Sequence, residues 1–196
     1  MPPPAAAFYF DLASPLAYLA AERVLHVLPG PAEWLPVLAS ELPGEEPLSA
    51  AARAQFTQSA VEFGLQPLRW PEPFPFDSSL AMRVATYARS IGRTVPFAQA
   101  AFRQAFAAGR SLAEPDSVLI AAAACEMHPR AVLQAADLRS AAEQLAGETA
   151  AAAAAGVDRV PAVRLIGEQG EESVVFVGQR ALERAAAQMT RTQARA

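Results

Sequence analysis

The 196-residue chain contains no lysine, so all 16 of its basic residues are arginine. Twenty acidic residues leave a formal net charge of −4, and both signs are spread along the chain. A nucleic-acid backbone or an anionic membrane surface is bound by a concentrated basic patch. We therefore expect neither nucleic acid nor a membrane as a partner. Arginine and lysine are not interchangeable, so an arginine that replaces a lysine of related proteins would bind its partner differently.

The chain has one cysteine, Cys125, and two histidines. A single cysteine excludes an intramolecular disulfide, a Cys-x-x-Cys redox pair and a zinc site built on several thiolates. His26 and His128 have no acid or thiol at a metal-ligand spacing, so no metal site is predicted. Any thiol chemistry must use the thiol of a bound ligand.

Long hydrophobic runs are also absent, although 53% of the residues are hydrophobic and only 18% are charged. No uncharged apolar stretch approaches the roughly 18 to 20 residues that a membrane-spanning helix needs. The first residues contain three prolines and no basic region, so they do not predict a secretory signal. We expect a cytoplasmic protein that buries a sizeable core.

The first 40 residues predict a β-α-β unit. Phe8-Tyr9-Phe10 is a short aromatic run with strand propensity, and Asp11-Leu12 follows it. We expect Asp11 to be a buried polar residue near the following turn. Ser14 and Pro15 are typical of the cap and first position of a helix, which we expect to continue for three to four turns until Pro29. A second strand follows at 34–38. Such a unit implies a parallel strand pair.

The middle of the chain predicts a series of helices. Apolar spacing of helical period, with Gly, Pro or polar residues at the ends, indicates helices near 49–64, 78–92, 97–109, 116–127 and 129–136. Between the first two of these helices, four prolines predict an extended loop rich in aromatic residues. This loop ends in Phe74-Pro75-Phe76.

The end of the chain returns to strands. A long Ala-rich helix is predicted from Asp137 to Ala155, followed by Gly156. Residues 162–166 and 173–177 flank a polar turn, which is typical of an antiparallel hairpin. A last helix is expected from about Gln179 to Met189, and a frayed tail after it.

This order of elements predicts an α/β protein with a thioredoxin-like fold and an all-helical insertion. We assign residues 1–42 and 137–196 to the thioredoxin-like domain and 43–136 to the insertion. In that fold the reactive group lies where the first strand turns into the first helix. Ser14 and Ala17 occupy the two positions that cysteines would take, which excludes dithiol redox chemistry. The proline of Val160-Pro161 is expected to be cis and to face this turn.

Four segments resemble the 2-hydroxychromene-2-carboxylate isomerase family, which belongs to the DsbA-like branch and is close to kappa-class glutathione transferases. The resemblance implies a glutathione-dependent isomerase of aromatic catabolism, which acts on an aromatic-derived conjugated small molecule. It also implies a homodimer, since many relatives form one. The segments are residues 8–20, 74–78, 156–162 and 175–180.

The resemblance further implies a glutathione site. Ser14 would hold the sulfur of glutathione without becoming a covalent nucleophile, because a hydroxyl can donate a hydrogen bond to a thiolate. The backbone of Val160, next to Pro161, would bind the cysteinyl part of the tripeptide. Gln179 and Arg180 occupy the position where relatives bind the γ-glutamyl group.

A substrate pocket would be lined by aromatic and polar side chains from two segments. Tyr18, Trp70 and Phe76 suit a flat apolar ring, because aromatic groups stack on one another and exclude water. Asp77 resembles the polar residue that follows the Phe-Pro-Phe loop in the family. Packing in the core and capping of a helix are the structural alternatives for these residues.

The sequence departs from the family in ways that keep other functions open. Residues 42–47 lack the Asn and Lys of relatives, with Arg53 and Arg69 as candidates for the missing cation, and Gly178-Gln179-Arg180 lacks the acidic residue. Ser14 alone also fits a helix cap worth about 1 kcal/mol. The alternatives are a kappa-like glutathione transferase, which consumes glutathione, and a non-catalytic binding protein that has lost the glutathione site.

Overall fold

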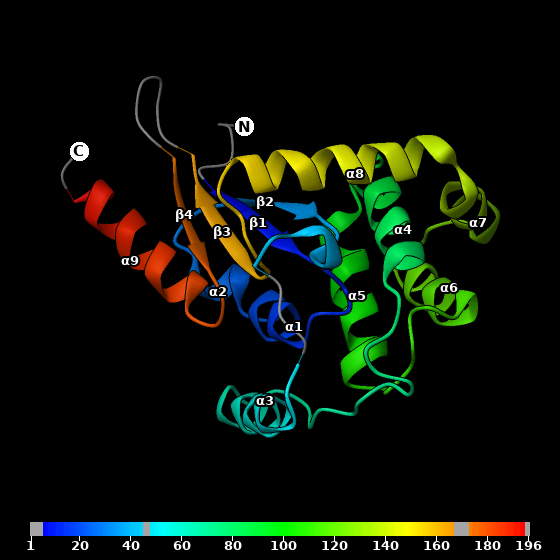
Figure 1. The fold of residues 1–196 in the computed structure, drawn as a ribbon, viewed down its shortest axis with the longest axis horizontal. Helices are drawn as coiled ribbons and strands as arrows, with labels where there is room; N and C mark the ends of the chain where they lie inside the picture. The colour runs from blue at the N-terminus through cyan, green and yellow to red at the C-terminus, as the bar shows by residue number, and fades with distance from the viewer. Residues whose placement is uncertain (1–5, 45–47, 167–172, 195–196) are drawn as a thin grey trace.

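The computed structural model describes residues 6–44, 48–166 and 173–194. Within these ranges the chain forms one sheet with helices on both of its faces and a further group of helices to one side, on the right in Figure 1. None of the helices in the described ranges combines the length and hydrophobicity needed to cross a membrane.

The sheet has four strands in the order β2-β1-β3-β4, and β1 is parallel to β2 and antiparallel to β3. The predicted β-α-β unit and the antiparallel pair β3-β4 are confirmed. The turn predicted at 167–171 lies outside the described residues. The second strand begins two residues earlier than predicted because it pairs with the whole of β1. The strands are β1 (Ala6–Phe10), β2 (Ala32–Pro36), β3 (Ala162–Leu165) and β4 (Val174–Val177).

The helices follow the predicted order, and the structure adds two short helices near the start. They are α1 (Pro15–Ala21), α2 (Val24–Val27), the 3-10 helix η1 (Ala39–Glu41), α3 (Ala50–Glu62), α4 (Ser79–Ser90), α5 (Thr94–Phe106), α6 (Pro115–Ala123), α7 (Pro129–Asp137), α8 (Arg139–Ala154) and α9 (Ala181–Gln193).

Several helix boundaries differ from the prediction. Helix α5 begins at Thr94 rather than at 97, α6 ends at Ala123 rather than at 127, and the first and last helices differ as well. The first helix has only two turns, because it ends at Ala21 and the chain restarts as α2 after Arg23, whose guanidinium pairs with Glu183 of α9. The last helix is longer than predicted and includes residues that were expected to fray. Buried Met189 anchors it, and the hydroxyl of Thr190 donates to a backbone carbonyl of the preceding turn.

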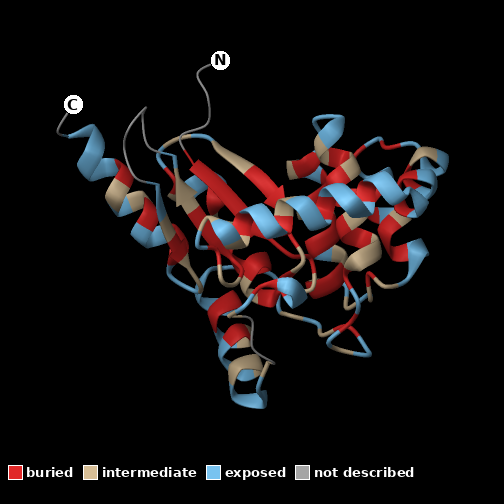
Figure 2. Ribbon diagram, turned by 45° about the horizontal axis from the view of Figure 1, so that its top comes forward, coloured by how far each residue is buried: buried red, intermediate tan, exposed pale blue. Residues whose placement is uncertain are grey.

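Strand β1 is buried on both of its faces. Phe8 and Phe10 belong to the larger core cluster, with α1, α5 and α9, while Ala7 and Tyr9 belong to a smaller cluster with α8. In Figure 2 this strand is buried along its length. A strand without a solvent face needs helices on both sides, which accounts for its uninterrupted apolar sequence.

The larger core cluster joins the two parts of the chain that the sequence analysis separated. Phe10 packs against Phe102 of α5, with 5.9 Å between their ring centroids. The helices α4 and α5 therefore share one core with the sheet. The division into residues 1–42 plus 137–196 and an insertion at 43–136 stays a prediction.

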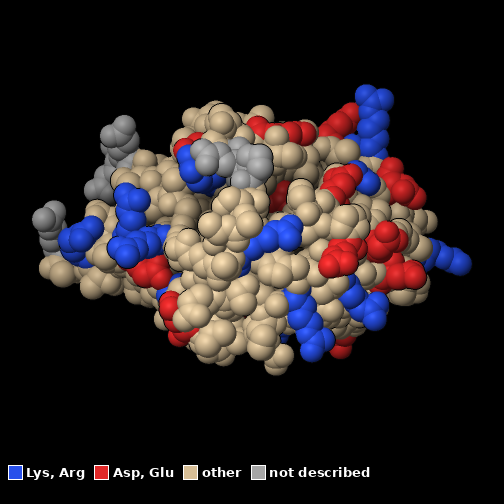
Figure 3. All heavy atoms as spheres, turned by 60° about the horizontal axis from the view of Figure 1, so that its bottom comes forward, with Lys and Arg blue, Asp and Glu red and all other residues tan. Residues whose placement is uncertain are grey.

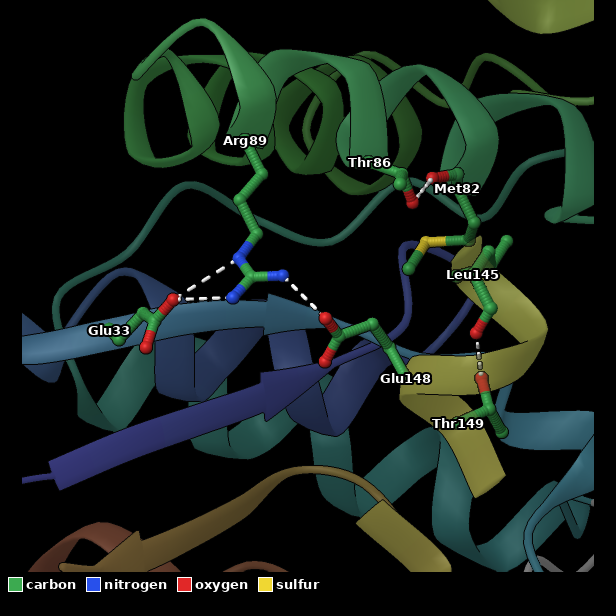
Figure 4. A network of polar contacts seen from close by, with 7 residues as sticks. All are labelled: Glu33, Met82, Thr86, Arg89, Leu145, Glu148 and Thr149. Carbon is green, nitrogen blue, oxygen red and sulfur yellow. Dashed lines mark hydrogen bonds and ion pairs between the residues drawn. The ribbon is translucent and has the colours of Figure 1, made fainter. Parts of the chain in front are cut away.

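A charged network ties α4 to the sheet and to α8. The guanidinium of Arg89 bonds Glu33 of β2 at 2.6 Å and Glu148 of α8 at 2.7 Å (Figure 4). These side chains are partly buried, so their interaction is screened less than that of a fully exposed pair. The network fixes α4, which directly follows the cavity residues Asp77 and Ser78, against β2 and α8.

We predict that Arg89→Met lowers the free energy of unfolding, because it leaves two partly buried carboxylates close together without a counter-charge. The expected loss is about 1–2 kcal/mol in urea denaturation. Arg139→Met is the matched control, since Arg139 pairs with Glu143 on the exposed surface of α8 and should lose about 0.5 kcal/mol or less. Equal losses in the two variants would contradict the assigned role of the network.

Candidate functional site

A cavity of about 760 Å³ opens at the end of β1. Its walls come from the β1–α1 turn, the segment 39–44, α3, the loop 74–78 and the segment before β3. Helix α3 lies at the bottom of Figure 1, the side that comes forward in Figure 3. Basic and acidic side chains are both spread over the face in Figure 3, without a field of one sign.

The β1–α1 turn presents two hydrogen-bond donors to this cavity. The Oγ of Ser14 accepts the N–H of Ala17 at 3.2 Å as the cap of α1. A hydroxyl that accepts one bond still has its own hydrogen to donate. The N–H of Leu16 takes part in no hydrogen bond among the described residues, and both Ser14 and Leu16 line the cavity. Capping and ligand binding by Ser14 are therefore compatible.

The segment before β3 presents free backbone groups to the same cavity. Val160 lines it, and neither its N–H nor its C=O bonds any residue in the described ranges. The Val160-Pro161 bond is cis, as predicted, and the bonds before Pro73 and Pro75 are cis as well, which the sequence did not predict. A ligand with a backbone-like amide could pair with Val160 as an added strand would.

Two of the predicted pocket residues lie on the cavity wall. Phe76 and Asp77 both line it, together with Phe74. Asp77 also caps the start of α4, because its Oδ1 accepts the N–H of Ser79 at 2.8 Å. The Phe-Pro-Phe loop therefore supplies an apolar wall that ends in a carboxylate.

The other two predicted pocket residues lie behind this wall. Tyr18 is fully buried in the core, where its ring stacks on Phe106 at 5.6 Å and burial raises the pKa of its phenol to about 12. Trp70 packs edge to face on Phe74 at 5.1 Å and does not line the cavity. Spacing could not separate these rings from those of the wall, because core and pocket are equally apolar.

Arg53 lines the cavity, whereas Arg69, the other candidate cation, does not. The guanidinium of Arg53 donates to the carbonyl of Phe74 at 3.0 Å and lies about 5 Å from the rings of Trp70 and Phe74. Arginine over an aromatic face gains a cation–π attraction. This contact holds the loop against α3 and keeps a positive charge at the wall.

A second cation, Arg159, lines the cavity and was not singled out in the sequence analysis. Its loose pair with Asp158 has N···O distances of 3.4 Å and is nearly half exposed, and among the described residues the guanidinium has no closer ionic partner, so within this part of the chain it is available to an anion. Gly44 permits the close approach, because a Cβ at that position would lie 3.1 Å from the Arg159 guanidinium. The available signal was the position of Arg159 directly before Val160-Pro161.

Gln179 and Arg180 lie outside the cavity lining, and both are exposed at the start of α9. The amide of Gln179 is 3.5 Å from the hydroxyl of Ser59 on α3. Gly178 donates its N–H to the carbonyl of Pro161 at 2.8 Å. This hydrogen bond places the start of α9, with Gln179, next to the segment that contains Val160. Their part in ligand binding stays a prediction.

Asp11 is almost completely buried and lines the cavity. Its Oδ1 accepts the N–H of Ala13, and its Oδ2 accepts the N–H of Ala39 and the hydroxyl of Ser78, at 2.8 to 3.0 Å. Burial raises the pKa of Asp11 above the usual 3.8, against the opposing effect of these hydrogen bonds.

The cysteine of the chain takes no part in this arrangement. Cys125 is buried after α6 and does not line the cavity. Burial raises the pKa of its thiol, which makes it a poor nucleophile. A reactive thiol at the Ser14 turn would therefore have to come from a ligand.

Comparison with known proteins identifies the fold. The sequence pattern of the DSBA-like thioredoxin domain matches residues 6–190, and no curated protein matches the chain. The structure of a 2-hydroxychromene-2-carboxylate isomerase superimposes with a TM-score of 0.78 at 19% identity, covering 97% of this chain and 98% of that one. A probable DsbA oxidoreductase from Streptomyces coelicolor has a TM-score of 0.79 at 17% identity, covering 98% and 91%.

The cytosolic disulfide reductase DsbM from Pseudomonas aeruginosa, solved with GSH, is a further structural neighbour. Its TM-score is 0.65 at 15% identity, with coverage of 97% of this chain and 99% of that one. At such identities the similarity shows the fold alone. The predicted membership of the DsbA-like branch and the predicted thioredoxin-like fold are confirmed.

We predict that Asp11 makes the stability of the protein depend on pH. A carboxyl with a raised folded-state pKa stabilises the fold fully below its unfolded pKa, and this contribution is lost as pH rises through the folded pKa. The free energy of unfolding of the wild type, relative to Asp11→Asn, should therefore fall as the pH rises above the usual pKa of 3.8. Urea denaturation at several pH values measures this difference, and a rise with pH would contradict it.

Proposed function

The chain belongs to the DSBA-like thioredoxin domain family, and we propose that it is a glutathione-dependent isomerase of the 2-hydroxychromene-2-carboxylate type. The observation that carries the proposal is one cavity lined by the Ser14 turn and by Val160, whose N–H and C=O are free within the described part of the chain. The wall of the same cavity contains two arginines and two phenylalanines of one loop.

The polar groups of the cavity fit the parts of glutathione. A thiolate at the turn would receive hydrogen bonds from the Ser14 hydroxyl and the Leu16 N–H, which lowers the pKa of the thiol. The cysteinyl residue would pair with the N–H and C=O of Val160. Arg159, beside Gly44, is suited to a carboxylate of the tripeptide, because a guanidinium binds carboxylates with two parallel hydrogen bonds.

The size of the cavity supports a second ligand beside glutathione. Its volume of about 760 Å³ lies within the 300–1,000 Å³ range of ligand pockets. Phe74 and Phe76 can pack on a flat conjugated ring, and Arg53 keeps a positive charge next to them. The substrate class proposed is an aromatic-derived conjugated carbonyl compound.

Bound glutathione would supply a nucleophilic thiolate that adds reversibly to a conjugated carbonyl compound. The role of this chain is to hold the thiolate of glutathione and to orient the substrate ring. Ser14 stabilises negative charge on sulfur, and the loop with Phe74 and Phe76 orients the ring against it. Arg53 can stabilise the negative charge that develops on the carbonyl oxygen, and such fixed charges are effective because they need no reorganisation.

Product analysis separates this activity from that of a kappa-like transferase, because an isomerase leaves glutathione unconsumed. A homodimer, implied by the resemblance, is part of the proposal and does not depend on the identity of the substrate.

We predict that glutathione stabilises the wild-type protein through Ser14. Ligand at about 100 times its dissociation constant adds roughly 2.7 kcal/mol and raises the melting temperature by roughly 5–10 °C. Ser14→Ala loses both the cap and the hydroxyl donor, so its melting temperature should fall and its response to glutathione should shrink. Thermal unfolding with and without millimolar glutathione measures both.

Ser14→Asp is the control that separates capping from thiolate binding. Aspartate is a good helix cap, so this variant should melt near the wild type without ligand. Its negative charge would repel a thiolate, and the response to glutathione should disappear. If glutathione raised the melting temperature of Ser14→Asp as much as that of the wild type, the thiolate would not bind at Ser14. If glutathione did not raise the melting temperature of the wild type, a binding protein that has lost the glutathione site would be favoured.

We also predict that Arg159 contributes to glutathione affinity. Arg159→Gln should weaken binding about tenfold in isothermal titration calorimetry, as expected for the loss of a charge-assisted hydrogen bond. Arg69→Gln is the matched control, because Arg69 is exposed and lies outside the cavity lining. Equal glutathione affinities of Arg159→Gln and Arg69→Gln would show that Arg159 does not bind glutathione.

A further inference from the structure

Asp11 is a buried carboxyl group in the cavity wall that has no counter-ion among the described residues. Its side chain forms no ion pair with any residue of the described ranges. The charged group that raises its pKa by proximity is Asp77, while Arg53 and Arg159 share the cavity wall without bonding it. Burying an unpaired charge is unfavourable unless hydrogen bonds compensate, so this carboxylate needs a specific reason to be there.

The compensation comes from three separate segments of the chain. Ala13 donates its N–H to Oδ1 at 2.8 Å, within the β1–α1 turn. Ala39, after β2, donates its N–H to Oδ2 at 2.8 Å. The hydroxyl of Ser78, at the start of α4, donates to Oδ2 at 3.0 Å. All three partners can donate, which suits an ionised carboxylate with acceptor oxygens only.

Each of these segments also supplies residues to the cavity. Ser14 and Leu16 follow Ala13, Ser40 follows Ala39, and Phe76 precedes Ser78 by two residues. The carboxylate is therefore placed where the three walls meet. A change in any of its hydrogen bonds would move one wall relative to the other two.

Helix α4 supports the same turn at a second point. The thioether of Met82, one helical turn after Ser78, accepts the N–H of Leu12 at 3.3 Å. Ser78, which directly precedes α4, and Met82 of α4 thus both contact the residues between β1 and Ser14. The position of the Ser14 turn is set by α4 rather than by the sheet alone.

We propose that Asp11 is a positioning residue of this site: its carboxylate joins the Ser14 turn, the segment after β2 and the start of α4, and thereby sets the shape of the ligand cavity. Asp11 acts through Ser14 and Phe76 and does not itself bind sulfur. We call the three hydrogen bonds of the Asp11 side chain the joint. The inference rests on the proposed function only for the identity of the ligand, because the joint itself is formed by residues of this chain.

The variant Asp11→Asn tests the joint with a side chain of nearly equal size. An amide has one acceptor oxygen and one NH₂ group that only donates. Whichever way it is turned, its NH₂ faces the N–H of Ala13 or the donors Ala39 and Ser78. One side of the joint must therefore open, although the volume of the side chain is retained.

Ser78→Ala removes one of the three bonds and keeps the carboxylate, so it remains informative if Asp11→Asn fails to fold. Thr86→Val is the matched control, because Thr86 is a buried hydroxyl residue of α4 that bonds the carbonyl of Met82 and does not line the cavity. Glutathione is the binding probe for all variants.

The first measurement is the amide NMR spectrum of each protein without ligand. We expect Asp11→Asn and Ser78→Ala to shift the amides of the Ser14 turn and of residues 39–42, and Thr86→Val to change only α4. In the wild type, the amides of Ala13 and Ala39 should titrate with one common midpoint above pH 3.8, and this titration should be absent in Asp11→Asn. Unchanged amides near Ser14, or separate midpoints, would overturn the proposal.

The second measurement is glutathione affinity by calorimetry. We expect binding to weaken about tenfold or more in Asp11→Asn, less in Ser78→Ala and not in Thr86→Val. Wild-type affinity in Asp11→Asn would overturn the positioning role. Failure of the wild type to bind glutathione would instead contradict the proposed function, and the amide spectra would then decide the role of Asp11 alone.

Discussion

The burial of β1 on both faces is the constraint on which the rest of the structure depends. Because Phe8 and Phe10 require one helical layer and Tyr9 requires another, α8 lies on one side of the strand, and α1, α5 and α9 lie on the other. The strand therefore ends inside the protein, where Asp11 is almost completely buried. Asp11 is the first residue after that end, so its carboxylate must find hydrogen bonds from the protein. The segments that supply them are the walls of the cavity, which links the core to the site.

The sequence predicted the fold well because its signals are local and repeated. Helical spacing, prolines at the starts of some helices and glycines after the ends of others mark many of the elements, and the order of elements is distinctive enough to indicate a thioredoxin-like chain. The errors concern boundaries that tertiary contacts determine. The ion pair of Arg23 with Glu183 joins residues that are 160 positions apart, and no local pattern at Ala21 could reveal that the first helix stops there.

Residues of the candidate site could be predicted where the fold fixes their position in the backbone. They were harder to predict where the packing of a side chain decides whether it lines the cavity or lies in the core. Ser14 and Val160 follow from the turn and the cis proline, whose places in the chain are fixed by the fold. Tyr18 on α1 and Trp70 in the loop pack into the core, whereas Phe76 lines the cavity, and aromatic composition alone does not separate these two environments. Arg159 escaped notice because a lone arginine is usually a solvated surface residue. Its contact with Gly44 depends on two loops more than 100 residues apart in the sequence.

Ser14 and Asp11 show how one turn can serve stability and binding together, with different consequences. The Ser14 hydroxyl accepts a backbone N–H and so stabilises α1, and it keeps its hydrogen for a ligand, so the two roles do not compete. Asp11 is different, because burial opposes its ionised form and its hydrogen bonds only partly offset that cost. An apolar residue of similar size would leave the N–H groups of Ala13 and Ala39 without acceptors, and the three walls would lose their common partner. A charged residue that opposes folding yet organises a cavity is what selection for binding, rather than for stability, would retain.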